Sequence, residues 1–229
     1  MINWTETEYG FSTVLESKYL IFFGKKNTTI EHLKNQFTKF SFYQIQQTHS
    51  NICLNADLTK ELEVGDAHYT QQTNKALIIK TADCMPILAY DKNSQNVLAI
   101  HAGWRGVENQ VISHALIKSK FQQPAVFIGP HILQKSFEVK FDAFTLLKQR
   151  VDSYNQPINY NSTFEQMKLD SYKISLLDIV NLEFKSRLKD SYSLETLMID
   201  TVTSNDFHSF RREKENAGRN LSFIVRIDS

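Results

Sequence analysis

The stretch from residue 81 to residue 106, TADCMPILAYDKNSQNVLAIHAGWRG, constrains the fold more than any other part of the chain. It contains two apolar runs, Met85–Tyr90 and Val97–Ile100, joined by the polar, turn-forming letters DKNS and two further polar residues. Two such runs around a short polar loop predict a buried antiparallel β-hairpin. Cys84 immediately precedes the first predicted strand and His101 immediately follows the second. Closure of the hairpin therefore brings a thiol and an imidazole close together.

A thiol and an imidazole held together can bind a metal ion or form a nucleophile and its base. His49 stands just beyond another short predicted strand, Phe42–Gln46, and is a third candidate ligand. Two histidines and one cysteine suit zinc, and three protein ligands leave a fourth position for water. The spacings between His49, Cys84 and His101 are not those of a zinc finger. From the pattern alone, a buried core thiol and ordinary hydrogen-bonded histidines are the simpler interpretation.

Other titratable residues lie near these predicted strand ends. Asp66 and Asp83 flank the strand that precedes the hairpin, and either carboxylate could orient a histidine ligand. His68 and His131 lie in predicted loops, from which they could reach the same cleft to support the ligand residues or contact a substrate. Cys53 follows an apolar residue, and core packing is its expected role.

The segment FHSFRRE, residues 207–213, and the following AGRN form a second group of chemical interest. Arg211, Arg212 and Arg219 join Arg105 of the GWRG string to give four guanidinium groups in loop-like segments. Arginine binds phosphate through two parallel hydrogen bonds, so this set could hold phosphate or an anionic substrate. We expect at least one of the four to form structural salt bridges instead.

Composition narrows the class of protein. With 229 residues, of which 41% are hydrophobic, the chain can bury a sizeable core. Its 26 Lys and Arg against 25 Asp and Glu leave no broad basic surface for nucleic acid or an anionic membrane. Two cysteines cannot form a disulfide framework. We find no signal peptide and no apolar run of about 20 residues, so we expect a cytoplasmic protein.

The remaining pattern alternates helices and strands. The helical expectations are residues 30–40, capped by Thr28 or Thr29, then 108–120, 141–151 and, longest, 170–188. Residues 13–23 are expected to include a strand, and further strands are expected at residues 76–80, 125–128, 196–199 and 221–227. Residues 153–163 are expected to be a surface loop. Helices mixed with at least one hairpin predict an α+β fold with mixed sheets, organised as a single domain over residues 1–229.

Several strings together resemble a known family: QTHS, GDAHYT, TADCMPIL, HAGWRG, IGPHI with FEV, FHSFRRE and AGRN. With them, the chain is similar to the YfiH family, also called the laccase-domain or multicopper polyphenol oxidase family. The resemblance covers nearly the whole chain, and HAGWRG with TADCMP is its most specific part. It implies a layered α/β/β/α sandwich with mixed sheets, related to cysteine-hydrolase-like folds.

The resemblance implies a zinc-dependent purine nucleoside phosphorylase, acting on adenosine, inosine, guanosine or methylthioadenosine with inorganic phosphate, that also has adenosine deaminase activity. It implies that His49, Cys84 and His101 are the metal ligands. Copper fits less well, because multicopper oxidation needs more ligands than one set of three. Roles assigned on this basis are phosphate binding by Arg105, Arg211 and Arg212, and proton handling by Asp83 or His68.

The chain departs from the family pattern at Val14, at His131, and at Asp200 with His208. Val14 replaces an arginine, which predicts altered phosphate or substrate binding at that edge. His131 replaces the cysteine of a GPC string, and Asp200 replaces the cysteine of a Cys-Thr pair. His208 replaces an aromatic residue before the arginines. None of these changes removes an expected metal ligand.

Other functions remain open at the level of sequence. Cys84 could be a nucleophile with His101 as its base, in a hydrolase without metal. A hydrolase that edits a nucleotide-linked peptidoglycan precursor is a second alternative, and a binding module without catalysis is a third. The sequence leaves open the preferred nucleoside and the oligomeric state.

Overall fold

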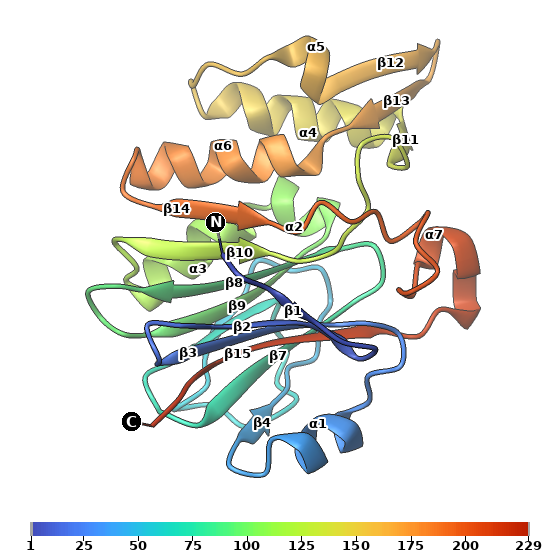
Figure 1. Cartoon of the computed structure of the whole chain (residues 1–229). Helices are drawn as coiled ribbons and strands as arrows, with labels where there is room; N and C mark the ends of the chain where they lie inside the picture. The colour runs from blue at the N-terminus through green and yellow to red at the C-terminus, as the bar shows by residue number, and fades with distance from the viewer. Residues whose placement is uncertain (1, 229) are drawn as a thin grey trace.

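A computed structural model describes residues 2–228 as a stack of layers around two large β-sheets (Figure 1). The first sheet contains, in spatial order, β1 (Thr5–Glu6), β2 (Gly10–Leu15), β3 (Tyr19–Gly24), β15 (Asn220–Arg226), β7 (Lys75–Thr81) and β4 (Ser41–Tyr43). The second contains β14 (Ser193–Thr196), β10 (Pro124–Ile128), β8 (Met85–Asp91), β9 (Val97–Ala102), β6 (Ala67–Thr70) and β5 (Cys53–Asn55). Each sheet includes both parallel and antiparallel pairs.

Helices cover the outer face of each sheet. The helix α1 (Ile30–Gln36) packs on the first sheet, where Leu33 is fully buried. The second sheet is covered by α2 (Trp104–Glu108), α3 (Val111–Ser119), α4 (Phe141–Ser153) and α6 (Leu176–Leu188). This arrangement confirms the α+β fold with layers in the order α/β/β/α and mixed sheets.

A smaller unit extends from the helical side, at the top of Figure 1. It consists of α5 (Tyr160–Thr163) and a three-stranded sheet of β11 (Glu138–Lys140), β13 (Ser171–Ile174) and β12 (Phe164–Lys168). At the right of Figure 1, α7 (Phe210–Glu213) and a 3₁₀ turn (Lys214–Asn216) precede the last strand. Among residues 2–228, no helix has the length and apolar character needed to cross a bilayer.

The predicted central hairpin is confirmed. Strands β8 and β9 pair antiparallel with Met85 opposite Ala102 and Pro86 opposite His101, so the Cys84 end of one strand meets the His101 end of the other. Both strands are buried along their whole length, because the first sheet covers one face and helices cover the other. Asp91 stabilises the far end, where its carboxylate accepts backbone N–H groups from both its own turn and the two residues before β10.

Two expected segments each contain a break. Residues 13–23, expected to include a strand, form the end of β2 and most of β3, a hairpin that turns at Glu16 and Ser17 with φ of 51° and 53°. The helix expected over residues 108–120 is the end of α2 followed by α3, separated at Gln110 with φ of 60°. A positive φ is usually found at glycine, and non-glycine residues seldom adopt it. No glycine stands at either break, so the sequence did not indicate them.

The expectation of one long helix over residues 170–188 is wrong. Residues Ser171–Ile174 form β13, and α6 begins only after Ser175, whose hydroxyl accepts the N–H of Asp178 as a helix N-cap. Tyr172 and Ile174 are buried with the alternating period of a strand. The expected strand over residues 196–199 lies earlier, as β14, and the expected loop at residues 153–163 ends in α5.

Candidate metal and anion site

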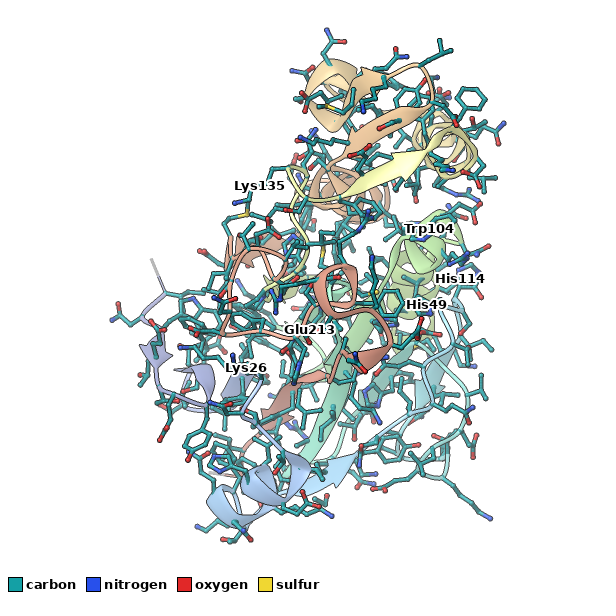
Figure 2. All side chains as sticks on the ribbon, turned by 90° about the vertical axis from the view of Figure 1, so that its right-hand side faces the viewer. Lys26, His49, Trp104, His114, Lys135 and Glu213 are labelled. Atoms are coloured by element: carbon teal, nitrogen blue, oxygen red, sulfur yellow. The ribbon has the colours of Figure 1, made fainter. Side chains whose placement is uncertain are left out.

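A cleft of about 980 Å³ opens where β8 begins and β9 ends. Its walls come from the loops after β4 and β7, from the start of α2, from β11 and from the α7 segment. Figure 2 looks onto this end of the molecule and shows His49 and Trp104 beside the segment that carries Glu213. All three candidate metal ligands line this cleft.

His49, Cys84 and His101 form a compact group. One ligand atom from each lies within 4.8 Å of the others, and the Cys84 Sγ is 3.7 Å from the His49 Nε2. The two imidazole rings are 4.8 Å apart and nearly perpendicular. The structure thus brings together three residues that are far apart in the sequence. A set of two histidines and one cysteine is a zinc-type donor set that leaves a coordination position open.

Asp66 holds the two histidines of this group in place through hydrogen bonds. Its buried carboxylate accepts hydrogen bonds from the backbone N–H groups of Thr48, His49 and Ser50 at 3.1, 3.0 and 2.6 Å and from the Ser50 hydroxyl at 2.7 Å. It also lies 2.7 Å from the His101 Nδ1. Burial raises the pKa of Asp66, but these hydrogen bonds outweigh burial and lower it to about 2. The carboxylate therefore fixes both histidines and leaves the His101 Nε2 for a metal ion.

The backbone around the ligands allows very close approach. A Cβ added at Gly103 would lie 2.7 Å from the His49 Cδ2 and 3.0 Å from the Cys84 Sγ. Two residues beside the site, His49 and Asp83, adopt left-handed φ of 63° and 82°. Non-glycine residues in this region are strained, so surrounding contacts must hold the two ligand-bearing loops in place.

Cys84 and His101 influence each other's protonation. Burial raises the pKa of the Cys84 thiol, but the adjacent His101 and His49 outweigh burial and lower it to about 6. Burial lowers the pKa of His101, whereas Cys84 and Asp66 raise it to about 9. Cys84 is therefore a thiolate at neutral pH, which is the form that binds metal ions.

Five cationic side chains line the same cleft: Lys80, Arg105, Arg211, Lys214 and Arg219. The Arg105 guanidinium lies 4.4 Å from the centre of the Trp104 ring. The Arg211 side chain donates to the Glu138 carbonyl at 2.9 Å. Lys80 and Lys214 were not among the site residues expected from the sequence. The available signals were that Lys80 ends a strand just before the TADC string and that Lys214 directly follows FRRE.

Arg212 has a different position from Arg211. Its guanidinium donates to the carbonyls of Thr201, Val202, Ser204 and Phe207 and pairs with Glu213. Arg212 does not line the cleft. It is the structural arginine that the sequence led us to expect among the four.

The two residues expected to handle protons are separated by the structure. Asp83 lines the cleft, but its carboxylate accepts the Thr201 hydroxyl at 2.7 Å and the Arg211 N–H at 2.6 Å. His68 lies on β6, fully buried between the two sheets, with its ring 5.6 Å from that of Tyr43. Burial lowers the pKa of His68 to about 3. The structure does not bring His68 into the cleft.

The departures from the family pattern also have clear positions. Val14 is exposed on β2 and does not line the cleft. His131 and Asp200 are both buried and face each other across a parallel β-bridge, so these two departures are neighbours in space. His208 lies beside the α7 segment, where its Nδ1 is 3.1 Å from Glu213.

One side of the cleft is apolar. Ile132, Phe137, Val139 and Leu176 line it from the helical side, and Phe210 lines it from α7. The Phe210 ring is exposed at the cleft surface. Flat aromatic ligands bind in clefts of this kind, where apolar walls are combined with a few polar groups.

Comparison with known proteins agrees with this geometry. Residues 25–227 match the family described as multi-copper polyphenol oxidoreductase laccase. A purine nucleoside phosphorylase of Clostridium acetobutylicum is 29% identical, covering 96% of this chain and 97% of its own length. One from Staphylococcus saprophyticus is 31% identical, over 73% of this chain and 62% of its own length. YlmD of Geobacillus stearothermophilus has a similar fold, with a TM-score of 0.85, 17% identity and 99% of both chains covered.

Proposed function

The chain belongs to the multi-copper polyphenol oxidoreductase laccase family, and from this premise we propose that it is a zinc-dependent purine nucleoside phosphorylase. The observation that carries the proposal is the cleft, in which a three-residue metal-ligand group, several cations and an apolar wall face one another. The Clostridium acetobutylicum relative, which is matched over 97% of its length, is named a purine nucleoside phosphorylase. A single three-ligand group does not suit multicopper oxidation, which needs more ligands.

The metal ligands would be His49, Cys84 and His101. Zinc bound there would supply Lewis-acid chemistry and positive charge to the cleft. The chain itself supplies the geometry: Asp66 fixes the tautomer of His101 and the backbone of His49, and Gly103 leaves room for the His49 ring and the Cys84 sulfur. These contacts hold the ligand atoms ready for the ion.

Arg105 and Arg211 are the proposed phosphate ligands. Guanidinium groups bind a phosphate dianion and hold one of its oxygens toward C1′ of the nucleoside ribose. In the reaction, a phosphate oxygen forms a bond to C1′ as the bond from C1′ to the purine nitrogen breaks. The purine leaves with the bonding electron pair and takes up a proton, and ribose 1-phosphate is the second product. Positive charge lining the cleft stabilises the negative charge that develops on the purine.

Asp83 has a positioning role in this proposal. Its two carboxylate oxygens accept the Thr201 hydroxyl and the Arg211 N–H. Asp83 therefore fixes, next to Cys84, the start of the cationic segment, by which we mean residues 210–219. The apolar wall would hold the purine ring, because stacking and burial favour a flat heteroaromatic group there. We do not assign a catalytic role to His68, since it lies outside the cleft.

Adenosine deamination is proposed as a second activity of the same site. The observation that favours it is the open coordination position of the three-ligand group, which is typical of hydrolytic zinc sites. The competing candidate is a metal-independent hydrolase with Cys84 as nucleophile, favoured by the thiolate beside His101. Activity that survives a strong chelator but is lost on thiol alkylation would support this hydrolase and contradict the zinc proposal.

The test combines metal analysis with turnover of adenosine, inosine, guanosine and methylthioadenosine, with and without phosphate. We expect stoichiometric zinc, phosphate-dependent release of the free base, and inosine formation from adenosine without phosphate. His101→Ala should lose the metal and the activity by about three orders of magnitude or more. His114→Ala is the matched control, because this exposed histidine on α3 does not line the cleft (Figure 2). Metal-free wild-type protein without nucleoside turnover would overturn the proposal.

A further inference from the structure

The cleft carries more positive charge than one inorganic phosphate requires. The whole chain is nearly neutral, with a net charge of +1, yet five cations line the cleft with Asp83 as its one carboxylate among the described residues. No ion pair formed by residues 2–228 involves any of the five. A phosphate dianion brings about two negative charges, so much of this positive charge remains available.

The five cations differ in depth. Lys80 and Arg211 are half-buried, whereas Arg105, Lys214 and Arg219 are exposed at the cleft surface. Lys80 is also occupied, since its Nζ donates to the Gln44 side chain at 3.3 Å. Lys214 makes no side-chain hydrogen bond to the described residues. Arg219 uses one guanidinium nitrogen for the carbonyls of Ala217 and Gly218 and keeps its other donors free.

Lys214 and Arg219 sit on a segment that is well fixed. The His208 ring contacts Glu213 and lies directly against Gly218, where an added Cβ would be 2.3 Å from the His208 Nε2. The side chain of Asn220 bonds both the N–H and the carbonyl of His208. Glu213 is engaged by His208 and Arg212 and therefore does not neutralise Lys214. A segment fixed in this way presents two free cations to the cleft at little cost in conformational entropy.

We propose that Lys214 and Arg219 form a second anion subsite, which binds a phosphoryl group carried by the substrate itself. The substrate class is then a nucleoside 5′-phosphate, with inorganic phosphate as the separate co-substrate at Arg105 and Arg211. This inference rests on the proposed phosphorylase function. It explains why cations continue along the rim from Arg211 to Arg219, beyond what a neutral nucleoside and one phosphate need.

The experiment compares 5′-AMP with adenosine in the zinc-loaded protein, at fixed low ionic strength. We expect kcat/KM for 5′-AMP to exceed that for adenosine by about tenfold or more, because two charge-assisted contacts are added. In K214A/R219A this preference should fall to about twofold or less. The matched control K34A/K39A removes two exposed lysines that do not line the cleft and should keep the wild-type preference.

Two results would overturn the inference while leaving the phosphorylase proposal intact. One is turnover of adenosine at a rate equal to or above that of 5′-AMP. The other is an increase of more than about threefold in the KM for inorganic phosphate in K214A/R219A with adenosine as substrate, which would assign these cations to the co-substrate. If neither compound is turned over, the proposed function fails. Equilibrium binding of 5′-AMP and adenosine to both variants then tests the subsite alone, and equal affinities in wild type would refute it.

Discussion

The two chemically active sides of the cleft are built in contrasting ways. On the metal side, one buried carboxylate, Asp66, takes five hydrogen bonds and thereby fixes both the backbone of residues 48–50 and the ring of His101. On the cationic side, the charged groups are largely exposed, and the segment that carries Arg211, Lys214 and Arg219 is fixed by contacts of Arg212, Glu213 and His208 and by Asp83. The metal side depends on buried geometry, and the cationic side depends on charge.

This difference has a physical consequence for how each side responds to change. Interactions of a buried carboxylate are poorly screened and depend on tenths of an ångström. Salt screens the interactions of exposed cations, and at physiological ionic strength these interactions are largely lost beyond a Debye length of about 8 Å. Substitutions on the metal side should therefore have large effects that salt does not modify, whereas effects on the cationic side should be moderate and dependent on salt.

The largest effect is expected for Asp66→Asn. The amide presents an N–H₂ group where the carboxylate accepts hydrogen bonds, so His101 and the loop at His49 lose their common anchor. We expect zinc affinity to fall about 10–100-fold and Tm to fall, measured by competition with a chromophoric chelator and by calorimetry. Asp206→Asn, at an exposed carboxylate paired with Lys25, is the control. Unchanged zinc affinity in Asp66→Asn would show that the metal side does not depend on this carboxylate.

A pair of glycines tests the packing of the metal side. In Gly103→Ala the new methyl group would lie 2.7 Å from the His49 ring and 3.0 Å from the Cys84 sulfur, so the ligands must move apart. We expect zinc affinity to fall about tenfold, because ligand geometry is disturbed but no ligand is lost. In Gly106→Ala, three residues further along, the nearest atom would be 3.4 Å away and the affinity should be unchanged. Equal zinc affinity in both variants would contradict the close packing described here.

Neighbouring arginines test the cationic side. Arg211→Gln should raise the KM for phosphate about tenfold at low salt, with a smaller ratio as salt increases, because a charged contact in the cleft is removed. Arg212→Gln removes hydrogen bonds to four carbonyls and should lower Tm by about 5 °C while changing the phosphate KM less than threefold. If both substitutions raise KM alike, the position of the segment matters more than the charge of Arg211.

The smallest effect on activity is expected at His68, which lies between the sheets. Burial lowers the pKa of His68 to about 3, so the folded state resists protonation, whereas the unfolded chain takes up a proton near pH 6.5. The free energy of unfolding of the wild type therefore decreases as the pH falls below about 6.5. In His68→Leu, about 2 kcal/mol of this decrease at pH 5 should be absent. Urea unfolding at pH 7 and pH 5 measures it. A large loss of kcat in this variant at pH 7 would show that His68 takes part in catalysis.

The sequence was most informative where local pattern and chemistry coincide. The hairpin around residues 85–102 followed from two apolar runs, and its strand ends placed Cys84 beside His101. The end of the short predicted strand Phe42–Gln46 offered His49 as a third candidate ligand, but local pattern could not place it beside the other two, because its position depends on the long-range contact with Asp66. Arg211 and Arg212 are chemically identical neighbours, and nothing local distinguishes the one in the cleft from the one that binds carbonyls.

Other features could not be predicted from the sequence for comparable reasons. The expected helix over residues 170–188 failed because a short strand and a helix both satisfy its apolar pattern, and the capping role of Ser175 appears only once the backbone is known. His68 occupies a GDAHYT string that suggested chemistry, but it is on the inner face of β6. Lys80 and Lys214 reach the cleft only because β7 and the segment after α7 meet there.

The contact between the His208 ring and Gly218 has a consequence for how relatives of this chain can diverge. Because an added Cβ at residue 218 would lie 2.3 Å from the ring, a side chain at this position requires the residue at position 208 to shift or become smaller. Relatives with a side chain at the position of Gly218 should have a small residue at the position of His208, and relatives with a large ring there should retain glycine. The shape of the cationic segment is thus inherited as a coupled pair of positions, which an alignment of many relatives would reveal as covariation.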